Sequence, residues 1–232
     1  MCTYHEAKLK EALRRAGLEE NEFRVLLAAF HVFTETRIEP TMPLPVLTGE
    51  REAVTMSWGF RRSFKRKDGK PGKTAAKPVV TAKCEKMDEF MWRDAYQHRR
   101  CIIPVTAFYE WTYPGGVMVA HRFHMDGDAF FVAGLWEESQ EYGFCHTMLT
   151  TEPNREVAAT GHDRCLVALL PQEIDPWLDG KPLADFHRPD GMFQVESGVP
   201  NPRERTKKPA PAAVEDAPEP PSPPKPVQGE LF

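Results

Sequence analysis

The sequence predicts an α+β fold that is rich in strands, carries flanking helices and ends in a disordered, proline-rich tail. Between residues 101 and 170, runs of β-forming residues alternate with turn residues. Apolar residues recur at helical spacing over residues 6–19 and again over 85–98. Past residue 200, large apolar side chains almost disappear, so the folded domain is predicted to span residues 1–198 and the tail residues 199–232.

The elements are expected in the following order. Leu9, Leu13 and Leu18 define one face of an amphipathic helix over residues 6–19. Residues 36–60 predict loops and short strands. A second helix is expected from Glu85 to His98, with an apolar face of Met87, Phe90, Met91 and Ala95. Strands are then predicted at residues 102–103, 117–124, 129–136, 144–150 and 166–170, followed by a short helix at 171–178.

Composition narrows the class of protein. Apolar residues make up 41% of the 232 residues, enough for a core, and the net charge of −4 excludes a uniformly basic nucleic-acid coat. No run approaches the roughly 20 apolar residues of a membrane span, and the first residues lack the apolar region of a secretory signal. The five cysteines form no C-x-x-C pair. We therefore expect no disulfide framework, no metal, no cofactor and no membrane partner, and a reducing cytoplasm as the compartment.

The first candidate for chemistry is Cys2. Removal of Met1 would leave a free α-amine and a thiol on adjacent carbons. An α-amine with a pKa of about 7.7–8.0 is partly neutral near pH 7 and can form a Schiff base with an aldehyde. The thiol could then close a five-membered thiazolidine ring. Taken alone, Cys2 is equally an ordinary residue of a frayed terminus.

Two further candidates are a carboxylate and an imidazole. Glu110 stands among aromatic residues in Phe108-Tyr109-Glu110-Trp111, where desolvation would suit it to proton transfer. The alternative is a surface glutamate that alternates with buried aromatics. His162, in Gly161-His162-Asp163-Arg164, has the side chain best suited to proton transfer at neutral pH, and Arg164 could hold a phosphate. The alternative is a structural histidine.

A basic segment is the fourth candidate. It contains a single acid, Asp68, among eight cationic residues. These are Arg61, Arg62, Lys65, Arg66, Lys67, Lys70, Lys73 and Lys77. In a chain of negative net charge, this concentration predicts phosphate contacts. A solvated loop is the alternative, and charge patterning alone does not separate the two.

The order of these motifs is more specific than any one of them. Met1-Cys2 is followed by Trp58-Gly59-Phe60, by Thr81-Ala82-Lys83-Cys84-Glu85, and by Arg100-Cys101-Ile102-Ile103-Pro104 with Phe108-Tyr109-Glu110-Trp111. Thr150-Thr151-Glu152-Pro153-Asn154 and Gly161-His162-Asp163-Arg164 come last. The sequence resembles the SRAP (SOS response-associated peptidase) family over roughly residues 2–198. The family shields abasic sites in DNA by cross-linking to them, and its fold is a mixed α+β pseudo-barrel.

The resemblance implies a set of roles. Cys2 would be the nucleophile, and Glu110 and His162 the acid–base groups around the sugar. Thr81 and Lys83 stand where the family has the Asn and Arg of its Asn-Ala-Arg-x-Glu block, so they would contact the linked sugar and DNA. Thr3 and Tyr4 likewise replace the family's Gly-Arg after Cys2. The substrate implied is single-stranded DNA that contains an abasic site, bound by a monomer associated with the nucleoid.

The end of the chain carries a separate motif. Gln228-Gly229-Glu230-Leu231-Phe232 resembles the peptide by which bacterial polymerases and repair proteins dock on the sliding clamp. Gln228 would orient the peptide, and Leu231 and Phe232 would fill an apolar pocket at the end of a flexible tether. Ten of the 22 prolines lie between Pro200 and Pro226, as a tether would require. Chance is the alternative, because a pattern of five residues is short.

Two rival functions remain open from the sequence. One is a hydrolase of peptides or amides that uses Cys2 as a thiolate paired with His162. The other is a non-catalytic module that binds DNA or the clamp. Self-removal of Met1 and slow strand scission through the imine are further activities that the family resemblance makes us expect.

Overall fold

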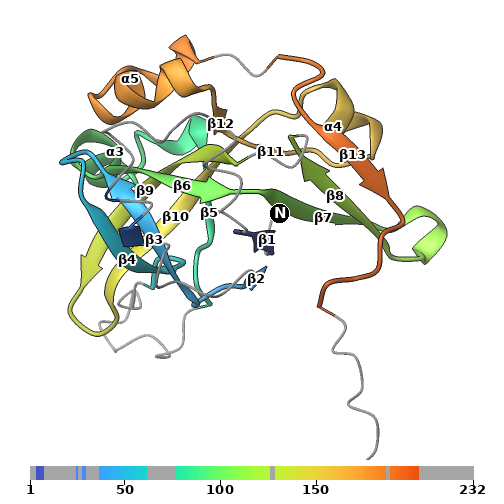
Figure 1. The fold of residues 1–232 in the computed structure, drawn as a ribbon, viewed down its shortest axis with the longest axis horizontal. Coiled ribbons are helices and arrows are strands. Elements are labelled where there is room, and N and C mark those ends of the chain that lie inside the picture. The colour runs from blue at the N-terminus through green and yellow to red at the C-terminus, as the bar shows by residue number, and fades with distance from the viewer. Residues whose placement is uncertain are drawn as a thin grey trace, which may run out of the picture. The chain divides into compact units, whose positions relative to one another are not determined.

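The computed structural model describes residues 4–7, 25, 28–29, 37–61, 77–125, 129–186 and 189–203. The chain divides into two units, Met1–Val199 and Pro200–Phe232. The strands and helices named below belong to the first unit (Figure 1). Within the described residues, no helix has the length and apolar character that a membrane crossing requires.

The larger of two sheets closes on itself. Its ring runs from β10 (Gly143–Thr151) through β4 (Ala53–Trp58), β3 (Pro43–Thr48), β6 (Arg100–Val105) and β9 (Phe130–Ser139) back to β10. The β4–β10 pair is parallel, and the other pairs of the ring are antiparallel. Three short strands extend it: β5 (Thr81–Lys83), β11 (Cys165–Leu166) and β12 (Ala168–Leu169). The expected strand-rich pseudo-barrel is therefore confirmed.

The interior of this barrel is tightly filled. Gly134 of β9 shows how closely the strands approach, because a Cβ at this position would lie 2.1 Å from Cδ1 of Ile103. Along β6, both faces of the strand are buried, since one faces the interior and the other packs against α3 (Arg93–His98) and α5 (Ile174–Leu178). The indole of Trp177 in α5 donates a hydrogen bond of 2.9 Å to the Cys101 carbonyl, which ties this helix to the barrel.

The smaller sheet receives the N-terminal segment. Its order is β13 (Gln194–Ser197), β8 (Val119–His124), β7 (Ala107–Thr112), β1 (His5–Glu6) and β2 (Arg37–Ile38). Only Thr106 separates β6 from β7, so the chain passes directly from the barrel into this sheet (Figure 1). As a result, β1 is an interior strand that pairs with β7 on one side and β2 on the other.

Two predicted helices differ from the structure. Glu6 belongs to β1 and not to a helix, and residues 8–19 lie outside the described residues. The helix expected from Glu85 is α-helical only over Arg93–His98, after a short 3-10 turn at Cys84–Lys86. Of the expected apolar face, Met87, Met91 and Ala95 do pack into or against the core. Phe90 was wrong, because it is 89% exposed and Trp92 enters the core instead, with its ring 5.6 Å from that of Phe60.

The short helix expected at 171–178 is present, as a 3-10 turn at Pro171–Glu173 that continues into α5. Pro176 fits there because it lies in the first turn of α5, where an amide hydrogen has no partner within the helix. Among the described residues, α4 (Arg155–Ala159) begins at Asn154, whose side chain accepts a hydrogen bond of 3.3 Å from the amide of Val157.

Candidate active site

Glu110 is a buried carboxylate and not the surface residue that alternation would give. It lies in β7, and only 3% of its surface is exposed. Four consecutive residues of this strand, Ala107–Glu110, are buried, so both of its faces are covered there. A buried carboxylate needs a charged or hydrogen-bonding partner, since desolvation without one is costly.

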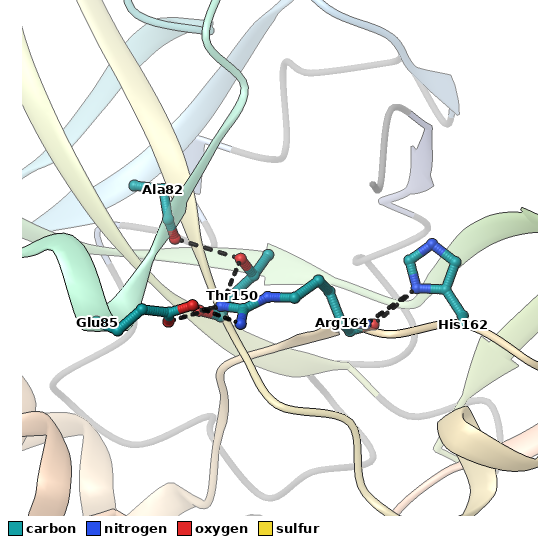
Figure 2. A network of polar contacts seen from close by, with 5 residues as sticks. All are labelled: Ala82, Glu85, Thr150, His162 and Arg164. Carbon is teal, nitrogen blue, oxygen red and sulfur yellow. Dashed lines mark hydrogen bonds and ion pairs between the residues drawn. The ribbon is translucent and has the colours of Figure 1, made fainter.

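His162 provides that partner. It lies in the loop between α4 and β11, just after Gly161, whose φ of +86° favours glycine. Nε2 of His162 is 3.0 Å from Oε2 of Glu110, and both side chains are almost fully buried. Nδ1 lies 2.9 Å from the Arg164 carbonyl oxygen and 3.3 Å from the Arg164 amide nitrogen (Figure 2). The shorter contact favours a hydrogen on Nδ1, because a carbonyl oxygen can only accept.

This arrangement leaves one proton to be shared between Nε2 and the carboxylate. With Nδ1 acting as a donor, Nε2 and Oε2 at 3.0 Å require a proton between them. The hydrogen bond to Glu110 raises the pKa of His162 above its ordinary 6.5, against the opposing effect of burial. The pair can therefore give a proton to a leaving hydroxyl and take one back, as general acid–base catalysis requires.

His121 extends this site across the smaller sheet. It is paired directly with Glu110 in the β7–β8 register, and Ser197 of β13 pairs with it on the other side. The ring is held at both nitrogens, by Oγ1 of Thr112 at 2.7 Å and Oγ of Ser197 at 2.8 Å. Burial, and secondarily the charge on His162, lower the pKa of His121. It is thus a neutral, fixed neighbour of the acid–base pair.

Arg164 forms a second polar network, shown in Figure 2. Its guanidinium binds both carboxylate oxygens of Glu85, at 2.8 and 3.0 Å, and donates to the carbonyl of Thr150 at 2.6 Å. The hydrogen bond from Arg164 lowers the pKa of Glu85. This arginine therefore joins the loop of His162 to the end of β10 and to the turn that follows β5.

A cavity of about 300 Å³ lies against this network. Its lining includes Thr81, Lys83, Lys86, Trp92, Thr150 and Arg164. Asp163 also lines the cavity, and the guanidinium of Arg164 is held by Glu85, so Lys83 is the cationic side chain best placed to meet an anionic group such as a phosphate. Three residues expected to contact DNA, Thr81, Lys83 and Arg164, are thus brought together on one cavity.

Arg61, the other described residue that was expected to contact DNA, lies elsewhere. Its guanidinium is 4.7 Å from the centre of the Tyr142 ring, in the turn between β9 and β10. Arg61 is not among the residues that line the cavity, although the neighbouring Phe60 packs against Trp92, which does line it. The other predicted residues, Cys2, Arg62, Lys65, Arg66, Gln228, Leu231 and Phe232, lie outside the described residues.

Sequence reasoning assigned no role to several residues that complete the site. Glu85 and Thr150 stand inside motifs that the sequence analysis quotes, so their proximity to Arg164 was a detectable signal. His121 carries no such signal, because only strand register brings it opposite Glu110. Within the described part of the chain, no group of three or more His, Cys, Asp or Glu side chains is arranged to hold a metal.

Comparison with known proteins agrees with these features. Residues 1–195 match the family described as SOS response associated peptidase (SRAP). "Abasic site processing protein YoaM" of Bacillus subtilis (strain 168) is 34% identical over 110 residues, which cover 44% of this chain. The match spans about half of that relative, 48% of its length.

Solved structures show the same fold. A protein from Bacteroides thetaiotaomicron superimposes with a TM-score of 0.62 at 18% identity, over 78% of this chain and 82% of that one. A protein from Bordetella bronchiseptica gives 0.60 at 22% identity, over 84% of this chain and 99% of that one. The match over residues 1–195 places this chain in the SOS response associated peptidase (SRAP) family.

Proposed function

We propose that the protein captures abasic sites in single-stranded DNA by forming a thiazolidine between Cys2 and the sugar aldehyde, which shields the lesion during replication and the damage response. The observation that carries this proposal is the 3.0 Å contact between Glu110 and His162 in a buried site. The family membership and the name of the Bacillus subtilis relative support an abasic site as the lesion.

The position of β1 supports Cys2 as the nucleophile. Tyr4 packs its ring against Tyr109 at 5.1 Å, and Tyr109 directly precedes Glu110. Two residues of chain span at most about 7 Å, so connectivity keeps the α-carbon of Cys2 within that distance of Tyr4. Connectivity therefore keeps Cys2 near β1, which pairs with the strand that carries Glu110.

The chemistry then needs the proton that the pair shares. The Cys2 amine adds to the aldehyde carbon, and the resulting hydroxyl leaves as water once His162 or Glu110 protonates it. The thiol sulfur next adds to the imine carbon, and its proton goes to the nitrogen as the five-membered ring closes. Each proton transfer falls to the hydrogen-bonded pair of Glu110 and His162. Lys83 would hold the neighbouring phosphate in the meantime.

One assay separates this function from its rivals. The protein, purified with Met1 removed, is incubated with single-stranded DNA that carries one abasic site, and adducts are resolved on denaturing gels. We expect a heat-stable adduct with wild type. Cys2→Ala keeps the amine, so it should give an adduct only after borohydride traps the imine. A heat-stable adduct of full yield with Cys2→Ala and no reductant excludes the thiazolidine, and turnover of a peptide substrate favours the hydrolase.

Two accompanying activities belong to the same proposal. Self-removal of Met1 would expose the amine, and slow strand scission would follow from the imine before the ring closes. His162→Ala should change strand scission or adduct reversal more than DNA binding. Time courses of nicked product and intact protein mass measure both activities in one reaction.

A further inference from the structure

One face of the smaller sheet carries a row of polar side chains across four strands. Tyr109 of β7, Arg122 of β8 and Glu196 of β13 lie directly opposite one another in the strand register. Glu6 of β1 lies diagonally from Tyr109, because it pairs with Ala107 two residues earlier. We call Glu6, Tyr109, Arg122 and Glu196 the β1 clamp.

The members of the β1 clamp are in contact. The Tyr109 hydroxyl donates to Oε1 of Glu6 at 2.7 Å. Nη2 of Arg122 lies 3.7 Å from Oε2 of the same carboxylate, while Nη1 bonds Glu196 at 3.0 Å. Glu6 is only 8% exposed and Tyr109 only 6%. Moving the buried Glu6 carboxylate away from Tyr109 and Arg122 would leave its charge without partners, which would destabilise the fold.

The opposite face of the same strands carries the proposed chemistry. Side chains alternate along a strand, so Glu110 and His121, which follow Tyr109 and precede Arg122, point away from the β1 clamp. His5 lies on the Glu110 side and packs edge-on against Trp58 at 4.9 Å. A slip of β1 by one residue would drive the Glu6 carboxylate into the apolar space of His5. The clamp thus admits one register of β1.

We propose that the β1 clamp positions the nucleophile: by fixing β1 against β7, it places Cys2 for attack on an aldehyde held beside Glu110. The clamp residues touch neither the substrate nor the reacting atoms in this scheme, so they are positioning residues. The inference rests on the proposed function. A misplacement of about 1 Å in a reacting group can lower a rate by about 100-fold.

The test uses two aldehydes. A small free aldehyde can react with Cys2 wherever the N-terminus lies, whereas the aldehyde of DNA bound to the protein reacts only where Cys2 can reach it. Tyr109→Phe removes only the hydroxyl that holds Glu6. Tyr96→Phe is the matched control, because its hydroxyl accepts a hydrogen bond from the Leu183 amide at 3.2 Å and is remote from β1. Rates are measured below the melting temperature of each variant.

We expect Tyr109→Phe to lower the rate constant of adduct formation at saturating abasic DNA by about 10- to 100-fold. The half-saturating DNA concentration and the small-aldehyde rate should stay within about twofold of wild type, and Tyr96→Phe should match wild type in all three. Glu6→Gln keeps the shape and an acceptor for Tyr109, so it should fold and show a smaller decrease in the same rate constant.

Three outcomes contradict the proposals in different ways. If wild type forms the adduct and both clamp variants form it equally fast, the β1 clamp has no positioning role. If Tyr109→Phe and Glu6→Gln slow the small-aldehyde reaction to the same extent as the DNA reaction, the substitutions have lowered the reactivity of Cys2 and have not changed its position. The positioning role then also fails. A wild-type protein that reacts with the small aldehyde but forms no DNA adduct overturns the proposed function instead.

Discussion

At the scale of single residues, the proposed catalysis depends on the proton between Glu110 and His162. The carboxylate raises the pKa of the imidazole above 6.5, so the protonated pair persists at a pH where an isolated histidine would be neutral. The Cys2 amine needs the opposite condition, because only its neutral form is a nucleophile. The rate of adduct formation should therefore pass through a maximum in pH.

Glu110→Gln tests this coupling. An amide cannot hold the positive charge of His162, so the pKa of His162 should fall, and the alkaline limb of the pH–rate profile should move to lower pH. The maximal rate should fall by about 10²- to 10⁴-fold, as is usual for the loss of a positioned acid or base. Single-turnover rates between pH 5 and 9 measure both. Binding of intact single-stranded DNA should be nearly unchanged. A profile identical to that of wild type would make the pair part of the scaffold.

Motif order predicted some of these residues and not others. Glu110 and His162 lie in motifs that carry the family resemblance, so the sequence singled both out as candidates. The pairing of Glu110 with His121, and of Tyr109 with Arg122, depends on the register of strands that are only formed in the folded chain. For Glu110 the sequence left open a desolvated carboxylate and a surface position, and only the folded chain decides between them, because both faces of the strand are covered there.

At the scale of elements, β1 depends on a dry environment. His5 of β1 and His146 of β10 are fully buried, and burial lowers the pKa of each to about 3. In the folded state these two histidines therefore bind protons only at low pH, whereas in the unfolded chain the same histidines take up protons near pH 6.5. The strand next to the proposed nucleophile is therefore stable only while both rings are neutral.

The free energy of unfolding should consequently fall with acidification. Since the folded pKa lies below the unfolded one, stability is lost as the pH decreases from about 6.5 towards about 3, by up to about 1.4 kcal/mol per pH unit for each histidine. His146→Gln should reduce this slope, whereas substitution of the exposed His98 should not. Urea denaturation at several pH values measures the slope. Equal slopes for wild type and His146→Gln would refute the assignment.

The cavity beside β5 gives a prediction about DNA affinity. If Lys83 contacts a phosphate, Lys83→Gln should reduce the slope of log affinity against log salt by about 0.7, the value for one lost contact to single-stranded DNA. The joint neutralisation of Arg61, Arg62, Lys65 and Arg66 should reduce it further. Arg51→Gln is the control, because Arg51 is engaged by Asp175 at 2.6 Å. An unchanged slope in the quadruple variant would show that the basic segment is a solvated loop that makes no phosphate contacts.

Local sequence patterns predicted some strands and helices better than others. The barrel strands were predictable, because β-forming runs separated by turns are a local signal. The helix expected from Glu85 to His98 was overestimated at its start. There the Arg93 guanidinium binds the Asp88 carbonyl at 2.6 Å, and Trp92 enters the core, so a continuous helix does not form. Such competition between side chain and backbone has no periodic signature.

At the scale of the whole molecule, the tail remains a separate prediction. Residues 204–232 lie outside the described residues. The peptide predicted to bind the sliding clamp is inferred from Gln228, Leu231 and Phe232 alone. Loss of an anchor residue in such a motif typically costs more than about 1 kcal/mol. A peptide of residues 221–232 should bind a bacterial sliding clamp with a dissociation constant of about 1 μM, equivalent to about 8 kcal/mol.

Replacing Leu231 and Phe232 with alanine should abolish that binding in a calorimetric or fluorescence titration. The same double variant of the full chain should still cross-link naked abasic DNA, since the predicted tether is separate from the chemistry. A peptide that fails to bind at high micromolar concentration would make the terminal motif a coincidence. Loss of cross-linking in the double variant would instead assign the tail to the folded domain.

The central claim is that the α-amine and thiol of Cys2 form the bond to DNA, and peptide mapping of the adduct tests it most directly. After nuclease and protease digestion, mass spectrometry should find the sugar remnant only on a peptide that begins at Cys2 without Met1, with the loss of one water. A version with an N-terminal tag, in which the amine is blocked, should yield no such peptide. A remnant on a lysine such as Lys83, or on a protein that retains Met1, would contradict the mechanism.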